Sequence, residues 1–153
     1  MIYNPVFYTF ITAHPKCIKV WDACNGKLVS VFRDLTTRDI TCICLDERKW
    51  KLFVGDSKGW VFSINIKNGA KMKKFEKHDQ DVSSLYYWGE KNIIISSSWD
   101  QKVRLSDDST SDPEGLEWYL MEKHDGSVNF IHFKPWQSLC ASCGDDGQVI
   151  IYN

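Results

Sequence analysis

The sequence SCGDDGQVIIYN at residues 142–153 is the fourth copy of a pattern that decides the fold. The earlier copies are SSSWDQKVRLSD at 96–107, VGDSKGWVFSIN at 54–65 and ITAHPKCIKVWD at 11–22. Each copy has a short first segment, a polar tight turn, and an alternating strand that closes on Asp or Asn. The copies start 43, 42 and 46 residues apart, and a nearly constant period of this size indicates a structural repeat.

Short strands and turn signals alternate along the rest of the chain. Asn25-Gly26 and Asn68-Gly69 are hairpin signals at equivalent places in two repeats. The polar stretch at 107–115 is expected to be a solvated loop that lengthens the third period. No stretch has a convincing helical pattern, so the sequence predicts an all-β fold.

Composition excludes several function classes. The chain has 153 residues, a formal net charge of −1 and seven Trp, and its charge predicts neither a nucleic-acid partner nor a membrane partner. No apolar run approaches the roughly 20 residues of a membrane helix, and no secretory signal peptide is recognised. The six Cys follow no regular framework, which favours free thiols in a reducing compartment. We therefore expect a cytoplasmic protein, although composition does not separate cytosol, nucleus and cilium.

The repeats carry motifs at matching positions. These are the dipeptide Trp21-Asp22, the turn and strand at Asp100–Arg104 and Asp146–Val149, and a His followed four residues later by Val at His78 and His124. In register with the period, they resemble the WD-repeat β-propeller family over essentially the whole chain. The resemblance implies four-stranded antiparallel blades around a central channel.

The same resemblance implies a structural clasp of His, Ser or Thr, Asp and Trp in each blade. The third unit offers His78, Ser96 and Asp100, with Ser106 in the place of Trp; the fourth offers His124, Ser142, Asp146 and Tyr152. The first unit keeps Trp21 but has Ile11 and Pro15 in the other places, and the second has Thr36, Val54, Lys58 and Ile64. The first two blades are therefore expected to depend on apolar packing.

The units are predicted as a partial blade at 1–33, full blades at 34–76 and 77–122, and a partial blade at 123–153. This incomplete set predicts a segment of a larger propeller whose remaining blades complete it. The alternatives are closure by a second chain, or a fragment with no independent function.

The expected function is a non-catalytic scaffold that binds a protein or peptide partner. In the family, partners bind at the turns around the top mouth of the channel, and the matching residues here are His14, Asp39, Ser57, Asp81, Trp99, Ser127 and Asp145. Their acidity favours a basic partner. A solvated turn surface is the plainer interpretation of the same residues.

Two other clusters have competing interpretations. Lys67, Lys71, Lys73, Lys74 and Lys77 surround the outer strand of the second unit, where lysines more often block strand pairing than bind nucleic acid. Trp50, Trp88 and Trp136 fall in turns on the opposite face, as partner anchors or as covers over neighbouring blades.

Enzymatic and metal-site interpretations are disfavoured. The Ser, His and Asp residues could suggest a hydrolase, but His78 precedes Asp100 by 22 residues and His124 precedes Asp146 by the same 22, and a nucleophile is needed only once. Cys140 and Cys143 form a C-x-x-C, yet residues three apart on a strand point to opposite faces. We predict no catalytic residue, no metal and no cofactor.

Overall fold

The all-β prediction is confirmed by a computed structural model, which describes residues 1–109, 117–120 and 124–152. The first sheet holds β1 (Ile2–Asn4), β2 (Thr9–His14), β3 (Cys17–Asp22) and β4 (Leu28–Arg33). The second holds β5 (Ile40–Leu45), β6 (Lys51–Asp56), β7 (Val61–Asn65) and β8 (Lys71–Lys74). The third holds β9 (Val82–Trp88), β10 (Ile93–Ser98), β11 (Val103–Asp107) and β12 (Glu117–Leu120). The fourth holds β13 (Val128–Lys134), β14 (Leu139–Gly144) and β15 (Val149–Tyr152), with a 3₁₀ turn at Pro135–Gln137.

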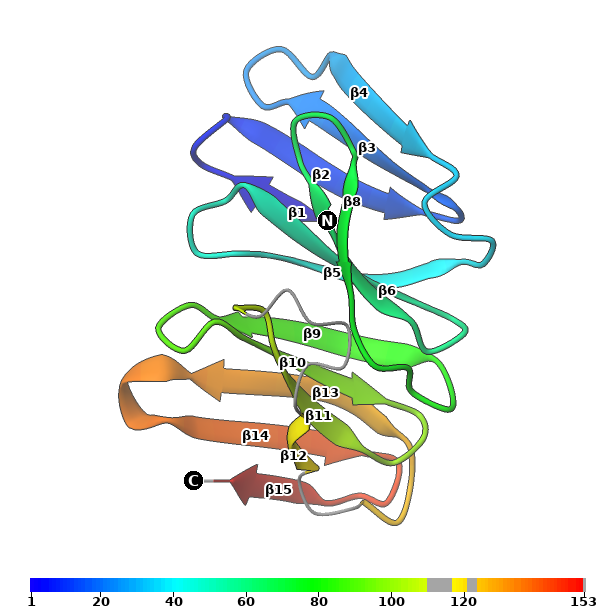
Figure 1. Ribbon diagram of the computed structural model, residues 1–153, viewed down its shortest axis with the longest axis vertical. Helices are drawn as coiled ribbons and strands as arrows, with labels where there is room; N and C mark the ends of the chain where they lie inside the picture. The colour runs from blue at the N-terminus through cyan, green and yellow to red at the C-terminus, as the bar shows by residue number, and fades with distance from the viewer. Residues whose placement is uncertain (110–116, 121–123, 153) are drawn as a thin grey trace.

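The four antiparallel sheets lie side by side in chain order (Figure 1). Their first strands are neighbours, since β1 contacts β5, β5 contacts β9, and β9 contacts β13. Residues of β5, β9 and β13 border a hollow of about 300 Å³. This arrangement of consecutive meanders around a shared inner side is that of propeller blades.

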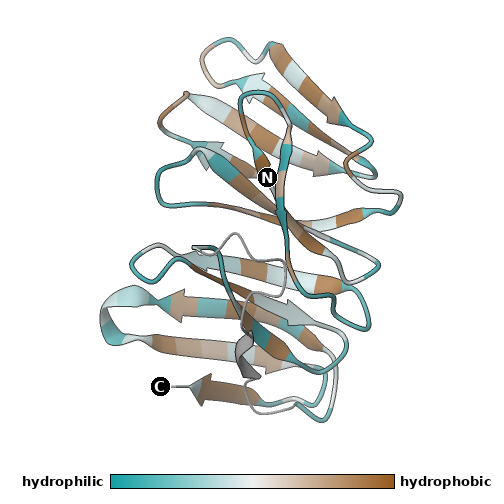
Figure 2. Cartoon of the chain, in the orientation of Figure 1, coloured by the Kyte–Doolittle hydropathy of each residue, from teal (hydrophilic) through white to brown (hydrophobic). Residues whose placement is uncertain are grey.

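The core lies between the sheets in three apolar clusters. Strand β6 contributes side chains to two of these clusters. Leu52 and Val54 join the cluster shared with the first sheet, whereas Phe53 between them joins the cluster shared with the third. Successive side chains on a strand point to opposite faces, so a blade with two neighbours needs apolar residues on both. Figure 2 shows the hydrophobic segments along the strands.

The two terminal sheets each differ from the middle ones in one respect. Strand β1 has three residues, and β13 to β15 form a three-stranded sheet. Asn153, at the end of the fourth predicted unit, lies outside the described residues. The division into partial blades at 1–33 and 123–153 and full blades between them stays a prediction.

The expectation that 107–115 is a solvated loop is wrong at Asp108. This side chain is buried, and one carboxylate oxygen accepts a hydrogen bond from Lys51 Nζ at 2.7 Å. The backbone N–H of Asp108 also donates to the carbonyl of Asn92. Lys51 of the second sheet thus compensates the buried Asp108 carboxylate, which the polar sequence around it had suggested to be in solvent. Residues 110–115 of the predicted loop lie outside the described residues.

Candidate functional site

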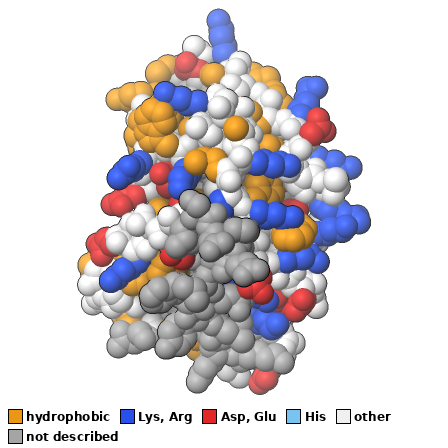
Figure 3. All heavy atoms as spheres, in the orientation of Figure 1, with side chains coloured by type: hydrophobic (Ala, Val, Ile, Leu, Met, Phe, Trp, Pro, Cys, Tyr) orange, Lys and Arg blue, Asp and Glu red, His pale blue; other side chains and the backbone are white. Residues whose placement is uncertain are grey.

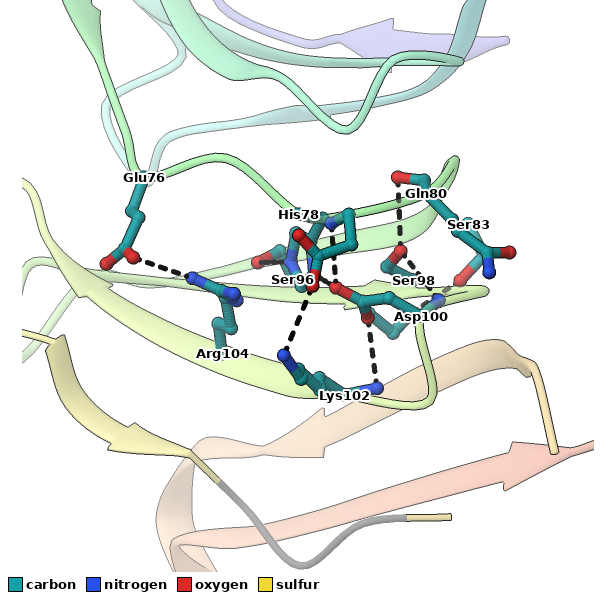
Figure 4. Close-up of polar contacts among 11 residues, drawn as sticks. Glu76, His78, Gln80, Ser83, Ser96, Ser98, Asp100, Lys102 and Arg104 are labelled. Atoms are coloured by element: carbon teal, nitrogen blue, oxygen red, sulfur yellow. Dashed lines mark hydrogen bonds and ion pairs between the residues drawn. The ribbon is translucent and has the colours of Figure 1, made fainter. Parts of the chain in front are cut away.

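The third sheet contains a closed chain of side-chain hydrogen bonds around His78. The His78 Nδ1 atom lies 2.9 Å from Asp100 Oδ2, and Nε2 lies 2.9 Å from Ser96 Oγ (Figure 4). An ionised carboxylate only accepts, so Nδ1–H donates to Asp100 and the Ser96 hydroxyl donates to Nε2. The three side chains come from the loop before β9, from β10 and from the turn after β10. These hydrogen bonds therefore hold the loop before β9 against the turn after β10.

The fourth sheet repeats this geometry with one more member. His124 Nδ1 lies 2.8 Å from Asp146 Oδ2, and Nε2 lies 2.7 Å from Ser142 Oγ. The Tyr152 hydroxyl lies 3.1 Å from the same Ser142 Oγ and acts as the donor, since Ser142 already donates to His124. Both histidine side chains are fully buried, and each ring nitrogen has a partner.

The surroundings favour the ionised form of both carboxyl groups. Burial by itself raises the pKa of Asp100, but hydrogen bonds from His78, Asp79 and Lys102 outweigh it and hold the pKa at about 2. At Asp146 the backbone N–H of Gln148 is the largest influence and lowers the pKa, assisted by hydrogen bonds from His124 and Asp125.

The low pKa of Asp100 predicts a specific acid sensitivity. The ordinary pKa of the carboxyl is 3.8 and the folded value is about 2, so the unfolded chain takes up the proton first. The stabilisation is therefore fully present above about pH 4 and is lost as the pH falls through about 2. Between pH 6 and pH 2, we expect the urea midpoint of Asp100→Asn to fall less than that of the wild type. Asp79→Asn, at an exposed neighbouring position, is the control; if all three declines are equal, Asp100 has no such role.

The clasp histidines also connect neighbouring sheets through their backbones. The His78 N–H donates to the carbonyl of Gly59 at 2.9 Å, and the His124 N–H donates to that of Gln101 at 3.2 Å. Gly59 and Gln101 occupy the same turn of successive sheets, and both have positive φ angles, 87° and 71°. Each clasp therefore joins the turn of one sheet to the side chains of the next.

In the first sheet, the Ser or Thr place belongs to Thr12 and not to Ile11. Trp21 Nε1 donates to Thr12 Oγ1 at 2.9 Å, and His14 Nε2 lies 2.9 Å from the same oxygen. The turn between β2 and β3 is one residue shorter than its counterpart in the fourth sheet, because Thr12 pairs with Lys19 whereas Ser142 pairs with Ile150. An ungapped alignment of the first repeat with the fourth, counted back from Trp21, therefore places the Ser or Thr position one residue too early.

In the second sheet, a different pair replaces the clasp. Thr36 Oγ1 donates to Asp56 Oδ2 at 2.7 Å, and the backbone N–H groups of Lys58 and Trp60 donate to Asp56 Oδ1. This blade was expected to depend on apolar packing in place of a clasp; it has that packing, and the Thr36–Asp56 pair adds a polar contact that was not expected. The sequence signal that could have indicated this pair is Asp56 at the end of an apolar strand, two residues before Lys58, where the clasp Asp was expected.

The residues predicted to form a binding surface come together in pairs on the edge that carries the clasps. The turns after β2, β6, β10 and β14 lie together on the right side of Figure 1. One backbone hydrogen bond recurs in three sheets: Ser57 N–H to the Asp39 carbonyl, Trp99 N–H to that of Asp81, and Asp145 N–H to that of Ser127. In the first sheet, His14 precedes Pro15, which forms an isolated bridge with Asp39. We call these seven residues the turn face: His14, Asp39, Ser57, Asp81, Trp99, Ser127 and Asp145.

The turn face is acidic and has one large exposed aromatic side chain. Trp99 is 46% exposed, although it lies between the buried residues Ser98 and Asp100. Asp39 and Asp145 are exposed and Asp81 is half-buried. Asn129, which sequence reasoning missed, donates to Asp145 Oδ1 and holds that carboxylate in place. The face offers hydrogen-bond acceptors and a flat ring, the groups that contact cationic side chains.

The three Trp residues of the opposite face differ from one another. Trp50 packs edge-on against Phe7 of the first sheet, and Trp88 packs against Phe133 of the fourth. Both therefore cover neighbouring sheets. Trp136 is 80% exposed in the turn after β13.

The cysteines are all free thiols. Cys140 is buried while Cys143 is half-buried, and burial raises the pKa of Cys140 to about 11. Among the described side chains, no group of three or more His, Cys, Asp or Glu residues is arranged to hold a metal. None of the described segments is a helix with the length and apolar character needed to cross a membrane.

Comparison with known proteins finds similarity to proteins that contain the same kind of repeat. A model of the WD domain, G-beta repeat, matches residues 69–107 and 118–153. Cilia- and flagella-associated protein 337 B of Tetrahymena thermophila is 31% identical over 148 residues, which cover 97% of this chain and 12% of that protein. Pre-mRNA-processing factor 17 of Homo sapiens and of Mus musculus is 23% identical over 148 residues, covering 92% of this chain and 24% of that protein. The chain thus spans less than a quarter of the length of each of these relatives.

The matched repeats contain the same residues that the structure brings together in the last two sheets. His78, Ser96 and Asp100 fall in the first match, and the residues around His124 fall in the second. The repeat period and the sequence of antiparallel meanders agree with both matches. The chain therefore contains WD repeats, and its antiparallel sheets have the arrangement of β-propeller blades.

Proposed function

We propose that this chain binds a protein or peptide partner through its turn face and that the partner contributes Lys or Arg side chains. WD repeats indicate a protein-interaction scaffold. The observation that carries the proposal is the backbone hydrogen bond that joins Asp81 to the exposed Trp99 on this face. A cation seated over an indole ring with a carboxylate beside it gains both ring attraction and charge complementarity.

A non-catalytic role is part of this proposal. His78, Ser96 and Asp100 have the connectivity of a catalytic triad, but His78 has no exposed surface and Ser96 is 4% exposed. His124 and Ser142 are each 1% exposed. A nucleophilic hydroxyl must reach its substrate, whereas a clasp functions only when it is sealed from water. The burial and the repetition of the arrangement both support a structural role.

The test uses labelled peptides rich in Arg and Lys, with matched peptides in which Glu replaces the basic residues. Binding of the basic peptides, measured by fluorescence anisotropy, should weaken about tenfold in Trp99→Ala, since a desolvated cation–π contact is worth about 1–2 kcal/mol. Asp81→Lys should weaken binding at least as much, because it turns attraction into repulsion. Raising the salt concentration should weaken binding to the wild type.

Trp136→Ala is the matched control, because it removes an exposed Trp from the opposite face. Its affinity should equal that of the wild type, with folding checked for all variants by circular dichroism. Equal affinity in Trp99→Ala, Asp81→Lys and wild type would remove the turn face as the binding site.

A second surface supports a further part of the proposal. The outer face of the fourth sheet carries Phe130, Val149 and Ile151, which are 56%, 68% and 68% exposed. In a repeat array such faces are buried by the next repeat. We propose that further blades or a second chain cover this face in the functional protein.

The proposed location is the cytoplasm, which the six free thiols support because reducing compartments keep cysteines unpaired. The names of the relatives refer to cilia and flagella and to pre-mRNA processing. Imaging of the tagged protein in cells distinguishes cytosol, cilium and nucleus.

A further inference from the structure

A cleft of about 640 Å³ lies between the first and second sheets, and none of the turn face residues lines it. Its apolar lining includes Leu35 and Phe62, which are nearly buried, and the ring of Trp60. Around them stand Lys16, from the turn between β2 and β3, and the lysines of β8. We call this feature the lysine cleft. In Figure 3, Lys and Arg side chains border hydrophobic side chains on the surface around β8.

The charge of the lysine cleft is predominantly positive. Four lysines line it, at positions 16, 71, 73 and 74, against the two carboxylates of Asp34 and Asp56. Asp56 already accepts hydrogen bonds from Thr36 and from two backbone N–H groups. Lys73 Nζ donates to the carbonyl of Asp107 in the third sheet. Lys16, Lys71 and Lys74 therefore dominate the electrostatic character of the cleft.

Aromatic rings position two of these lysines. The Lys74 Nζ atom lies 3.1 Å from the centroid of the Trp60 ring, and Lys71 Nζ lies 5.9 Å from that of Phe62. These contacts hold the ammonium groups over the apolar lining, so less side-chain freedom is lost when an anion binds. An ammonium group on a ring retains its capacity to donate hydrogen bonds to a carboxylate.

We propose that the lysine cleft binds an extended acidic peptide segment of a partner protein. Carboxylates of the segment contact Lys16, Lys71 and Lys74, and an apolar side chain between them lies against Leu35 and Phe62. Strand β8 is the last strand of its sheet, and lysines on such an edge repel basic strands and would lose hydration without compensation against uncharged ones, whereas an acidic strand compensates their charge. The ligand has the opposite charge to the one proposed for the turn face, so the two sites take different partners.

The test measures binding of a labelled twelve-residue peptide in which Glu and Leu alternate, against the same peptide with Gln in place of Glu. The Glu peptide should bind the wild-type chain at least about tenfold more tightly than the Gln peptide, with an affinity that falls as salt is added. Lys71→Glu combined with Lys74→Glu should weaken binding by about tenfold or more, whereas the double Arg variant should retain it.

The matched control is Lys27→Glu combined with Lys134→Glu, which changes the net charge equally at positions outside the cleft. Its binding should equal that of the wild type, and circular dichroism checks the folding of both double variants. Equal weakening in the control, or equal binding of the Gln peptide, would overturn the proposal. A single-stranded oligonucleotide of the same charge that binds more tightly than the peptide, and that loses binding in Lys71→Glu with Lys74→Glu, would also overturn it by making the site one for nucleic acid.

Discussion

Replacing Gly59 by Ala is expected to destabilise the protein by about 2–5 kcal/mol, the sum of a backbone penalty of about 1–2 kcal/mol and a steric one of about 1–3 kcal/mol. Gly59 has a φ of 87°, a conformation that costs an L-residue about 1–2 kcal/mol. An added Cβ would also overlap the carbonyl oxygen of His78 and lie 2.7 Å from that of Gln80. Both are backbone atoms of the loop that presents the His78 clasp, so relief of the overlap must displace the clasp.

Gly147→Ala is the matched control for this prediction. Gly147 occupies the same turn position in the fourth sheet with a φ of 72°, but no atom lies within 4 Å of its added Cβ. It pays only the backbone penalty of about 1–2 kcal/mol. Urea unfolding followed by circular dichroism measures both variants. Equal losses would show that Gly59 is required for its backbone conformation alone and that contact between the two sheets is not tight there.

The contrast between these glycines shows why repeats of one sequence pattern are not structurally equivalent. Gly59 faces the loop that leads into the third sheet, and the His78 N–H donates to its carbonyl. In the third sheet, Gln101 holds the same place with a positive φ, and its side-chain amide reaches the Asp125 carbonyl. The turn of each blade is thus part of its junction with the next.

The fold was predictable because several independent signals agree. The period set the number of units, and alternation within strands such as β6 set the faces that are buried. The His78 and His124 clasps follow from fixed spacing, because two strands and a turn of constant length bring the same positions together. Such spacing is preserved only where the turn keeps its length.

One error arose where a turn changed its length, and two arose where a carboxylate has a partner that the repeat pattern does not indicate. The turn after β2 is one residue shorter, so Thr12 takes the place assigned to Ile11. In the second sheet the carboxylate sits on the strand end at Asp56, and Thr36 reaches it from the preceding loop. Asp108 has its cation, Lys51, 57 residues away in the sequence. No local pattern reports a partner in a neighbouring blade.

The lysine cleft could not be predicted from the sequence either. The cluster of lysines was visible, and edge protection was the favoured interpretation. Only the fold places Lys16 of the first sheet and Leu35 of the connecting loop opposite β8, which converts an edge into a lined hollow. The two interpretations are compatible, since lysines that repel most strands can select an acidic one.

The purified 153-residue chain is expected to self-associate, because apolar faces at its two ends are exposed. On the fourth sheet, Val149 pairs with Cys143 and Ile151 pairs with Ala141, so the two exposed side chains lie on one face with Phe130. On the first sheet, the exposed Tyr3 packs against Phe10, which is only partly buried. These faces belong to opposite ends of the row of sheets (Figure 1), so copies would associate head to tail.

Light scattering should therefore give a mass above 17.8 kDa that rises with concentration. Burying a Val or Ile side chain contributes roughly 1.5–3 kcal/mol, so Val149→Lys combined with Ile151→Lys should raise the concentration of half-association about a hundredfold or more. Trp136→Lys places a lysine on an exposed aromatic position outside this face and should leave the mass unchanged. A wild-type chain that stays monomeric at all concentrations would show that these apolar faces do not bind each other. Equal loss of association in both variants would instead locate the contact elsewhere. The head-to-tail arrangement requires that the fourth-sheet substitutions weaken association and that Trp136→Lys does not, because neighbouring sheets in a repeat array stack through their faces and Trp136 lies in a turn.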